Sequence, residues 1–202
     1  YDAFWGCGNL SSVHIGSVES WCSIVYNTTS ALPLLHAENC YLYLKGKQIT
    51  ELIVPEGVTS VGDYVFYNYK NLKSIVFPES VTSIGKSAFY NCNSLTSITI
   101  PGSVTSVKES AFAKCSNLNK VTSLSMNPPT LYNNQTFDES VYTSATLQVP
   151  VGSLEAYQNA PGWKRFANIV ELNKYHITYT ADNEVYATDS LYEEAPISIP
   201  RI

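Results

Sequence analysis

The 202-residue chain has little charge, since Asp, Glu, Lys and Arg together make up 14% of its residues. Its formal net charge is -5, so no basic field is available to hold a phosphate backbone or an acidic membrane surface. We therefore expect no nucleic acid partner. No apolar run approaches the roughly 18 residues of a membrane-spanning helix, and the first residues lack the basic and apolar regions of a signal peptide. We expect no membrane insertion in this chain, and any export signal or anchor would lie outside it.

Catalytic and metal-binding patterns are also scarce. Three histidines occur, and none has the spacing to another histidine or to a cysteine pair that would bind zinc. No G-x-S-x-G, H-E-x-x-H, phosphate-loop or dinucleotide-binding motif is present. A pair between Cys22 or Cys40 and His36 would lack an orienting third group. We expect no catalytic residue, no metal site and no cofactor, and we interpret the chain as a non-enzyme.

What the sequence does contain is an internal repeat of 23 residues. Proline, phenylalanine and leucine recur in one register: Pro55, Pro78 and Pro101; Phe66, Phe89 and Phe112; Leu72, Leu95 and Leu118. A further copy opens the chain, where Ala3 to Leu10 matches Ala88 to Leu95. We therefore expect that the chain begins within a repeat and that the natural protein extends upstream.

Each repeat contains the pattern of one short strand. Leu95, Ile98 and Ile100 have the spacing of inward-facing strand residues, and Pro101 then ends the hydrogen-bonded ladder. Glu109 to Phe112 predicts a helical or 3-10 turn on the return side. A single coil buries too few side chains to offset its backbone ordering, which costs about 1–2 kcal/mol per residue. The sequence therefore predicts a right-handed α+β repeat solenoid, in which stacked coils each contribute one short parallel strand.

The repeat unit resembles the BspA-like class of leucine-rich repeat, a Bacteroides-type family of bacterial cell-surface proteins. The likeness rests on Pro, then Ser-Val-Thr-Ser-Ile-Gly, then Ala-Phe, Cys and Leu, kept without a gap from Ile49 to Leu118. Tyr69 in place of Cys, Val65 in place of Ala and Lys108 in place of Gly depart mildly from it. The resemblance implies a location at the cell surface or outside the cell. It also implies a scaffold repeat that has no catalytic motif.

We assign residues 1-172 to a leucine-rich repeat domain. Residues 16-48 are interpreted as an expanded repeat, which ends in a hairpin that turns at Lys45-Gly46. Residues 122-172 form the expected C-terminal cap, with a short capping helix at Ser153 to Gln158.

Residues 173-202 are interpreted as an appended β-hairpin or truncated surface module. Alternating stretches flank a predicted turn from Ala181 to Glu184. This segment resembles the start of a β-grasp surface repeat, although it lacks the turn glycine at Asn183. We expect little independent stability from two strands alone.

The five cysteines fall into two groups. Cys7, Cys92 and Cys115 occupy an inward position of the repeat, where cysteine acts as a small buried apolar residue. Cys92 and Cys115 are expected to be stacked neighbours that need no disulfide. Cys22 and Cys40 lie in the expanded repeat, and their pairing stays open because it depends on an oxidising compartment.

Binding residues are expected on the outward side of the strands, where stacking would align small and mostly uncharged side chains. The candidate residues are Glu51, Ile53, Ser74, Val76, Ser97, Thr99, Lys120 and Thr122. A second candidate is the aromatic row that follows each repeat phenylalanine, Trp5, Tyr67 and Tyr90. These rings could stack on sugars, but packing against loops of adjacent coils is the more ordinary explanation.

Two functions from different classes remain open. The first is a cell-surface module that adheres through its sheet face to a host or extracellular-matrix protein, or to a polysaccharide. The second is a structural spacer that displays another domain of a larger surface protein. An enzyme fragment is the weakest alternative. The full-length sequence would discriminate among them, because an appended catalytic domain favours the spacer.

Overall fold

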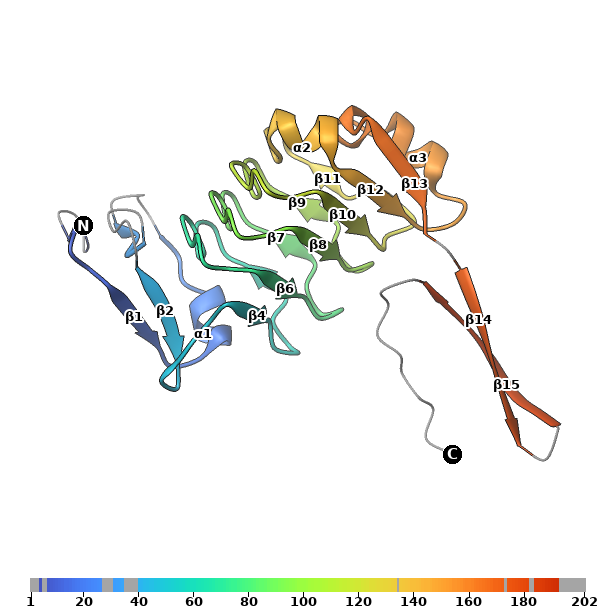
Figure 1. Ribbon diagram of the computed structural model, residues 1–202, viewed down its shortest axis with the longest axis horizontal. Helices are drawn as coiled ribbons and strands as arrows, with labels where there is room; N and C mark the ends of the chain where they lie inside the picture. Colours follow the sequence, from blue (N-terminus) through green and yellow to red (C-terminus); the bar gives the residue numbers. More distant parts are fainter. Residues whose placement is uncertain are drawn as a thin grey trace.

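The structure is a computed structural model. The described residues are 4, 7–26, 31–34, 40–133, 135–172, 174–181 and 184–192. Short strands from successive repeats lie side by side along the molecule, and helices pack at the C-terminal end of this array (Figure 1).

Each repeat contributes strands to two rows. The first row contains β4 (Glu51–Ile53), β6 (Ser74–Val76), β8 (Ser97–Ile100), β10 (Lys120–Ser123), β12 (Thr146–Val149) and β13 (Asn168–Glu171). The second row contains β5 (Ser60–Val61), β7 (Ser83–Ile84), β9 (Ser106–Val107) and β11 (Thr130–Leu131). Neighbours pair in parallel with the register of the repeat, as in Lys120 opposite Ser97. The ladder of the first row divides between β6 and β8.

The expectation of one strand per repeat is therefore wrong, because the second row adds a two-residue strand to each coil. This strand falls in the Val-Thr-Ser-Ile stretch, whose apolar members Val81 and Ile84 are both buried. The helical or 3-10 turn predicted at Glu109 to Phe112 is present only as single hydrogen-bonded turns, in which the Ala113 amide donates to the Ser110 carbonyl at 3.1 Å, and no helix forms. Ser110 adopts a φ of 57°, a left-handed conformation that cannot continue a helix.

A small sheet at the N-terminal side joins the first repeat copy to the expanded repeat. It comprises β1 (Ser12–Ile15), β2 (Tyr41–Leu44) and β3 (Lys47–Gln48), and α1 (Val18–Cys22) follows β1. β1 and β2 pair in parallel, whereas β2 and β3 form the predicted antiparallel hairpin. Lys45 and Gly46 both have positive φ, as a tight hairpin turn requires. The sequence did not predict α1.

The core is organised around a column of phenylalanine rings. Phe66, Phe89, Phe112 and Phe137 stack nearly parallel, with centroid separations of 5.3, 5.4 and 5.6 Å. The first three rings are 0% exposed, which confirms that the 23-residue register places them on one inward face.

Tyr69 occupies the cysteine position of its coil, and its hydroxyl forms hydrogen bonds that explain this substitution. Its hydroxyl donates to the Ile49 carbonyl and accepts from the Leu42 amide at 3.3 Å. The longer tyrosine therefore reaches the hairpin of the expanded repeat, a distance that a cysteine could not span.

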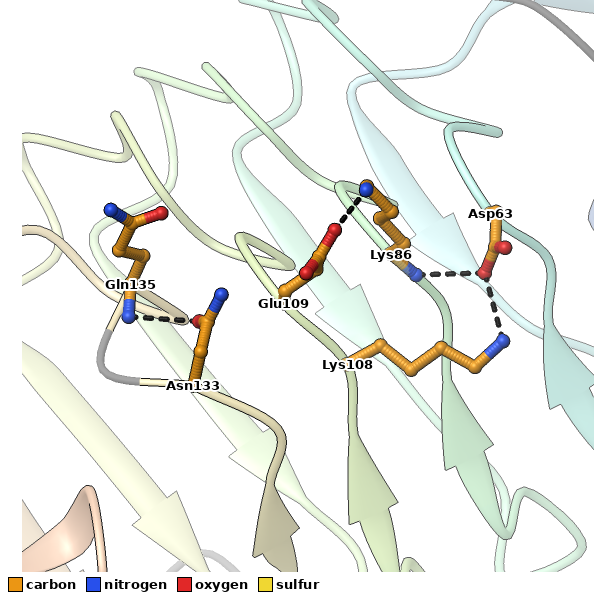
Figure 2. Close-up of polar contacts among 6 residues, drawn as sticks. All are labelled: Asp63, Lys86, Lys108, Glu109, Asn133 and Gln135. Carbon is orange, nitrogen blue, oxygen red and sulfur yellow. Dashed lines mark hydrogen bonds and ion pairs between the residues drawn. The ribbon is translucent and has the colours of Figure 1, made fainter.

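Polar side chains also connect the coils on the return side. The Asp63 carboxylate accepts from the Lys86 amide at 2.8 Å and from the Lys108 ammonium at 3.2 Å, while Lys86 pairs with Glu109 (Figure 2). These side chains are partly exposed, so each ion pair contributes modestly to stability.

An aromatic cluster closes the C-terminal end of the column. The cap contains α2 (Glu139–Ser144), α3 (Leu154–Asn159) and the 3-10 helix η2 (Trp163–Arg165). Tyr142 and Phe166 contact Phe137 edge-on, and the Trp163 indole donates to the Pro129 carbonyl at 2.7 Å. The predicted capping helix corresponds to α3, whereas α2 was not predicted.

The chain continues into an antiparallel hairpin of β14 (Lys174–Ala181) and β15 (Glu184–Tyr192). Asp182 and Asn183 of the predicted turn lie outside the described residues. The division of the chain after residue 172 stays a prediction.

All five cysteines are free. Cys7 is exposed, so its predicted inward position is wrong, whereas Cys92 and Cys115 are buried as expected. Cys22 and Cys40 are buried without forming a disulfide. The Cys92 and Cys115 thiols donate to carbonyls of the preceding coil, those of Phe66 and Phe89, at 3.3 and 3.1 Å. Burial raises the pKa of Cys22 and of Cys115 to about 12.

Phe89→Ala is expected to lower the free energy of unfolding by about 3–5 kcal/mol, because it leaves a cavity between two stacked rings. Thr99→Ala, at a half-exposed position of β8, should change that free energy by about 0.5 kcal/mol or less. Chemical denaturation of both variants measures the difference. Equal losses would contradict the inward and outward assignments.

Iodoacetamide is expected to modify Cys7 rapidly in the native protein, while the four buried thiols react only after unfolding. Mass spectrometry of the labelled protein identifies the modified sites. Rapid native labelling of Cys92 or Cys115 would contradict their placement in the core.

The stability should also fall as the pH rises from 9.0 to about 12, because the unfolded chain ionises its thiols first while the folded chain keeps Cys22 and Cys115 protonated. Denaturation across this range should give a shallower decline for Cys115→Ala than for the parent.

Candidate functional site

The outward side of the first strand row exposes two aliphatic side chains next to each other. Ile53 and Val76 lie opposite one another in the β4–β6 register and are 68% and 57% exposed. Thr99 of β8 occupies the next equivalent position and is half-buried. The other outward residues of the same strands lie two positions earlier in each repeat. Of these, Glu51 and Ser97 are exposed, and Ser74 and Lys120 are half-buried. The strands thus bring most of the predicted binding residues to one face.

Thr122 is the exception, because its side chain is 0% exposed. Its hydroxyl donates to the Gln148 side chain at 3.1 Å, across the pairing of β10 with β12. The expectation that Thr122 presents a contact surface is therefore wrong. The accessible part of this row consists of Ile53, Val76 and Thr99.

A groove of about 510 Å³ lies where the outward row meets the carboxyl ends of the strands. The exposed side chains of Ile53 and Val76 line it together with Thr99. The repeat prolines Pro55, Pro78 and Pro101 continue the lining beyond the strands. The groove therefore extends the predicted sheet face past the end of the ladder.

Phe77 also lines the groove and links it to the core. Its side chain is half-buried and contacts Phe89 edge-on, with ring centroids 5.8 Å apart. The equivalent residues Val54 and Ile100 are buried. The phenylalanine column thus supports the floor of the groove.

Two glutamates supply the charge of the groove lining. Glu56 and Glu79 follow successive repeat prolines and are both exposed. The Glu79 carboxylate accepts from the Ser103 amide at 3.2 Å. Among the described residues, neither glutamate forms an ion pair. Sequence reasoning missed both because it considered only strand positions, although the recurring Pro-Glu pair was visible.

The second candidate row lies on the return side. Tyr67 and Tyr90 stack on each other with centroids 4.6 Å apart and an interplanar angle of 4°. The Lys114 ammonium lies over the Tyr90 ring at 5.4 Å, and the Tyr64 ring tilts against Tyr67. Burial, and then the neighbouring Tyr90, raise the pKa of Tyr67. These contacts cover ring faces that a sugar would need. Trp5 lies outside the described residues.

The described residues contain no group of three His, Cys, Asp or Glu side chains placed to hold a metal ion. His36, the histidine considered and rejected above as a partner of Cys22 or Cys40, lies outside them. The raised pKa of both thiols, caused by burial, disfavours the thiolate that a nucleophile requires. Within the part of the chain that the structure describes, every helix is too short or too polar to cross a membrane.

Comparison with solved structures finds leucine-rich repeat proteins. A protein from Eubacterium ventriosum superposes with a TM-score of 0.50 at 18% identity, over 80% of this chain and 49% of that one. A protein from Bacteroides ovatus gives 0.47 at 21% identity, over 85% and 39%. A leucine rich cell surface protein from Faecalibacterium prausnitzii gives 0.41 at 20% identity, over 83% and 56%. The chain thus spans between 39% and 56% of their lengths.

No protein of curated function matches this chain. The model of the BspA type leucine rich repeat region matches residues 38–159 in six copies. This match covers more than half of the chain, and it extends from the β2–β3 hairpin through the paired strand rows to the end of α3 in the cap. The protein therefore belongs to the BspA-type leucine-rich repeat family.

Proposed function

We propose that this chain is a non-enzymatic binding module of a surface or secreted protein, and that it adheres to an extracellular partner through the outward face of its first strand row. The contact residues are Ile53, Val76 and Thr99, with Glu51, Ser74, Ser97 and Lys120 beside them. In this proposal the stacked coils form a right-handed solenoid that continues as a regular platform. The surface location follows from membership of the family.

The observation that carries this proposal is the exposed aliphatic pair at the groove. Ile53 and Val76 are more than half exposed although they lie opposite one another on adjacent strands. Burying an aliphatic side chain contributes about 1.5–3 kcal/mol, so a partner that covers both gains several kcal/mol. Association itself costs about 4–15 kcal/mol, which two side chains cannot offset. Binding must therefore use a wider part of the face or several copies at once.

A protein is the favoured partner and a polysaccharide the second candidate. The groove offers aliphatic side chains and prolines, which suit the side chains of a polypeptide. Free aromatic faces would suit sugars better, but the Tyr67 and Tyr90 rings stack on each other. A spacer without a ligand remains the alternative from a different class.

A double variant tests the face directly. Val76→Glu with Thr99→Lys keeps the net charge but places two charges in the outward row of Ile53, Val76 and Thr99. It should therefore weaken binding about ten-fold or more. Ser140→Glu with Gln158→Lys makes the same charge changes at exposed positions of α2 and α3 and should leave affinity unchanged. The measurement is a binding screen on extracellular-matrix proteins and glycans, with thermal unfolding to check the fold.

If the double variant binds a partner as well as the parent does, the strand face is not the contact surface. If the parent binds none of the proteins or glycans on the screen, the spacer function replaces this proposal. The rows contain little charge, so adding salt should weaken binding only mildly.

A further inference from the structure

The residues that line the groove indicate which kind of protein segment the face binds. This inference rests on the proposed function. We infer that the groove holds an extended polypeptide segment with two neighbouring features. An aliphatic or aromatic side chain of the segment packs against Ile53, Val76 and Phe77. A lysine or arginine close to it in sequence pairs with Glu56 and Glu79.

The apolar half of the groove is built to receive a side chain. Ile53 and Val76 are open to solvent, and Phe77 lies against Phe89 of the buried column. Because Phe77 contacts the closely packed core, the floor should move little when a ligand binds. The groove volume of about 510 Å³ falls within the range of sites that bind small ligands and peptide side chains.

The charged half of the groove favours a partner segment with positive charge. Glu56 and Glu79 follow equivalent prolines of adjacent coils, and they are the charged residues of the groove lining. Both carboxylates give the groove lining negative charge, and no cation pairs with either among the described residues. A cationic side chain of the partner would complement this charge, and Ile53 and Val76 would lie beside it in the same groove.

The same features argue against a polysaccharide in this groove. An acidic polysaccharide would meet two carboxylates and no lining cation. A neutral one would find few uncharged side-chain hydrogen-bonding groups in the lining, where Thr99 supplies a hydroxyl. A polypeptide satisfies both halves, because it can place an apolar and a basic residue within a few positions of each other.

Selection from a displayed library of random heptapeptides tests the inference. Peptides are selected on the parent protein and then depleted on the Val76→Ser variant, which removes the exposed aliphatic side chain without adding charge, so that survivors depend on the apolar half of the groove. We expect the survivors to combine an aliphatic or aromatic residue with a lysine or arginine within about four positions. A survivor and its Lys→Gln or Arg→Gln counterpart are then synthesised for affinity measurements.

Glu56→Gln and Glu79→Gln should each weaken the selected basic peptide about three- to five-fold, as expected for an exposed ion pair. Neither substitution should affect the counterpart peptide that lacks the cation. Glu155→Gln, which removes an exposed carboxylate from α3, is the matched control and should change neither affinity. Added salt should reduce the difference between the two peptides.

Three outcomes of the peptide experiments would overturn this inference. The survivors could lack basic residues, the glutamate variants could bind the basic peptide as tightly as the parent, or no peptide could survive depletion. If a polysaccharide binds the parent but not the Val76→Glu, Thr99→Lys variant, the proposed function stands and this inference fails. Equal binding of a partner by that double variant and the parent would refute the proposed function itself.

Discussion

The close stacking of successive coils is the constraint on which the rest of the structure depends. A Cβ added to Gly85 would lie 2.6 Å from the backbone carbon and oxygen of Gly62, so the backbones approach as nearly as glycine permits. The Phe66 and Phe89 rings of the same two coils stack with their centroids 5.3 Å apart. Both contacts require equivalent residues of adjacent coils to lie directly beside each other. The 23-residue spacing meets this requirement, and parallel strand pairing follows from it.

Stacking also explains how a sequence of small side chains can form a recognition surface. A single strand of three or four residues offers only one or two outward side chains, but pairing places Ile53 beside Val76. The same translation brings Glu56 and Glu79 to adjacent coils next to this apolar pair. The groove is therefore a property of several coils together. Its floor remains tied to the core through Phe77 and Phe89.

Departures from the repeat occur where a coil meets something other than a regular neighbour. Tyr69 replaces cysteine beside the hairpin of the expanded repeat and bonds to its backbone. Lys108 replaces glycine and reaches back to Asp63 across two coils. At the other end, Tyr142, Trp163 and Phe166 cover the last ring of the column. Tyr69 and the cap aromatics thus cover the two ends of the column, whereas Lys108 adds a partly exposed ion pair along the return side.

The sequence by itself determined the repeat, the inward column of Phe66, Phe89 and Phe112, and the family, because a fixed spacing of apolar residues leaves one way to bury them. It also indicated the outward row, since side chains alternate along a strand. Only the tertiary structure decided that Thr122 is buried. Its hydroxyl donates to Gln148 on the neighbouring strand β12, and the 23-residue spacing no longer holds between β10 and β12, so the sequence did not predict this pairing. The groove likewise required the structure, because its depth depends on how coils pack beyond their prolines.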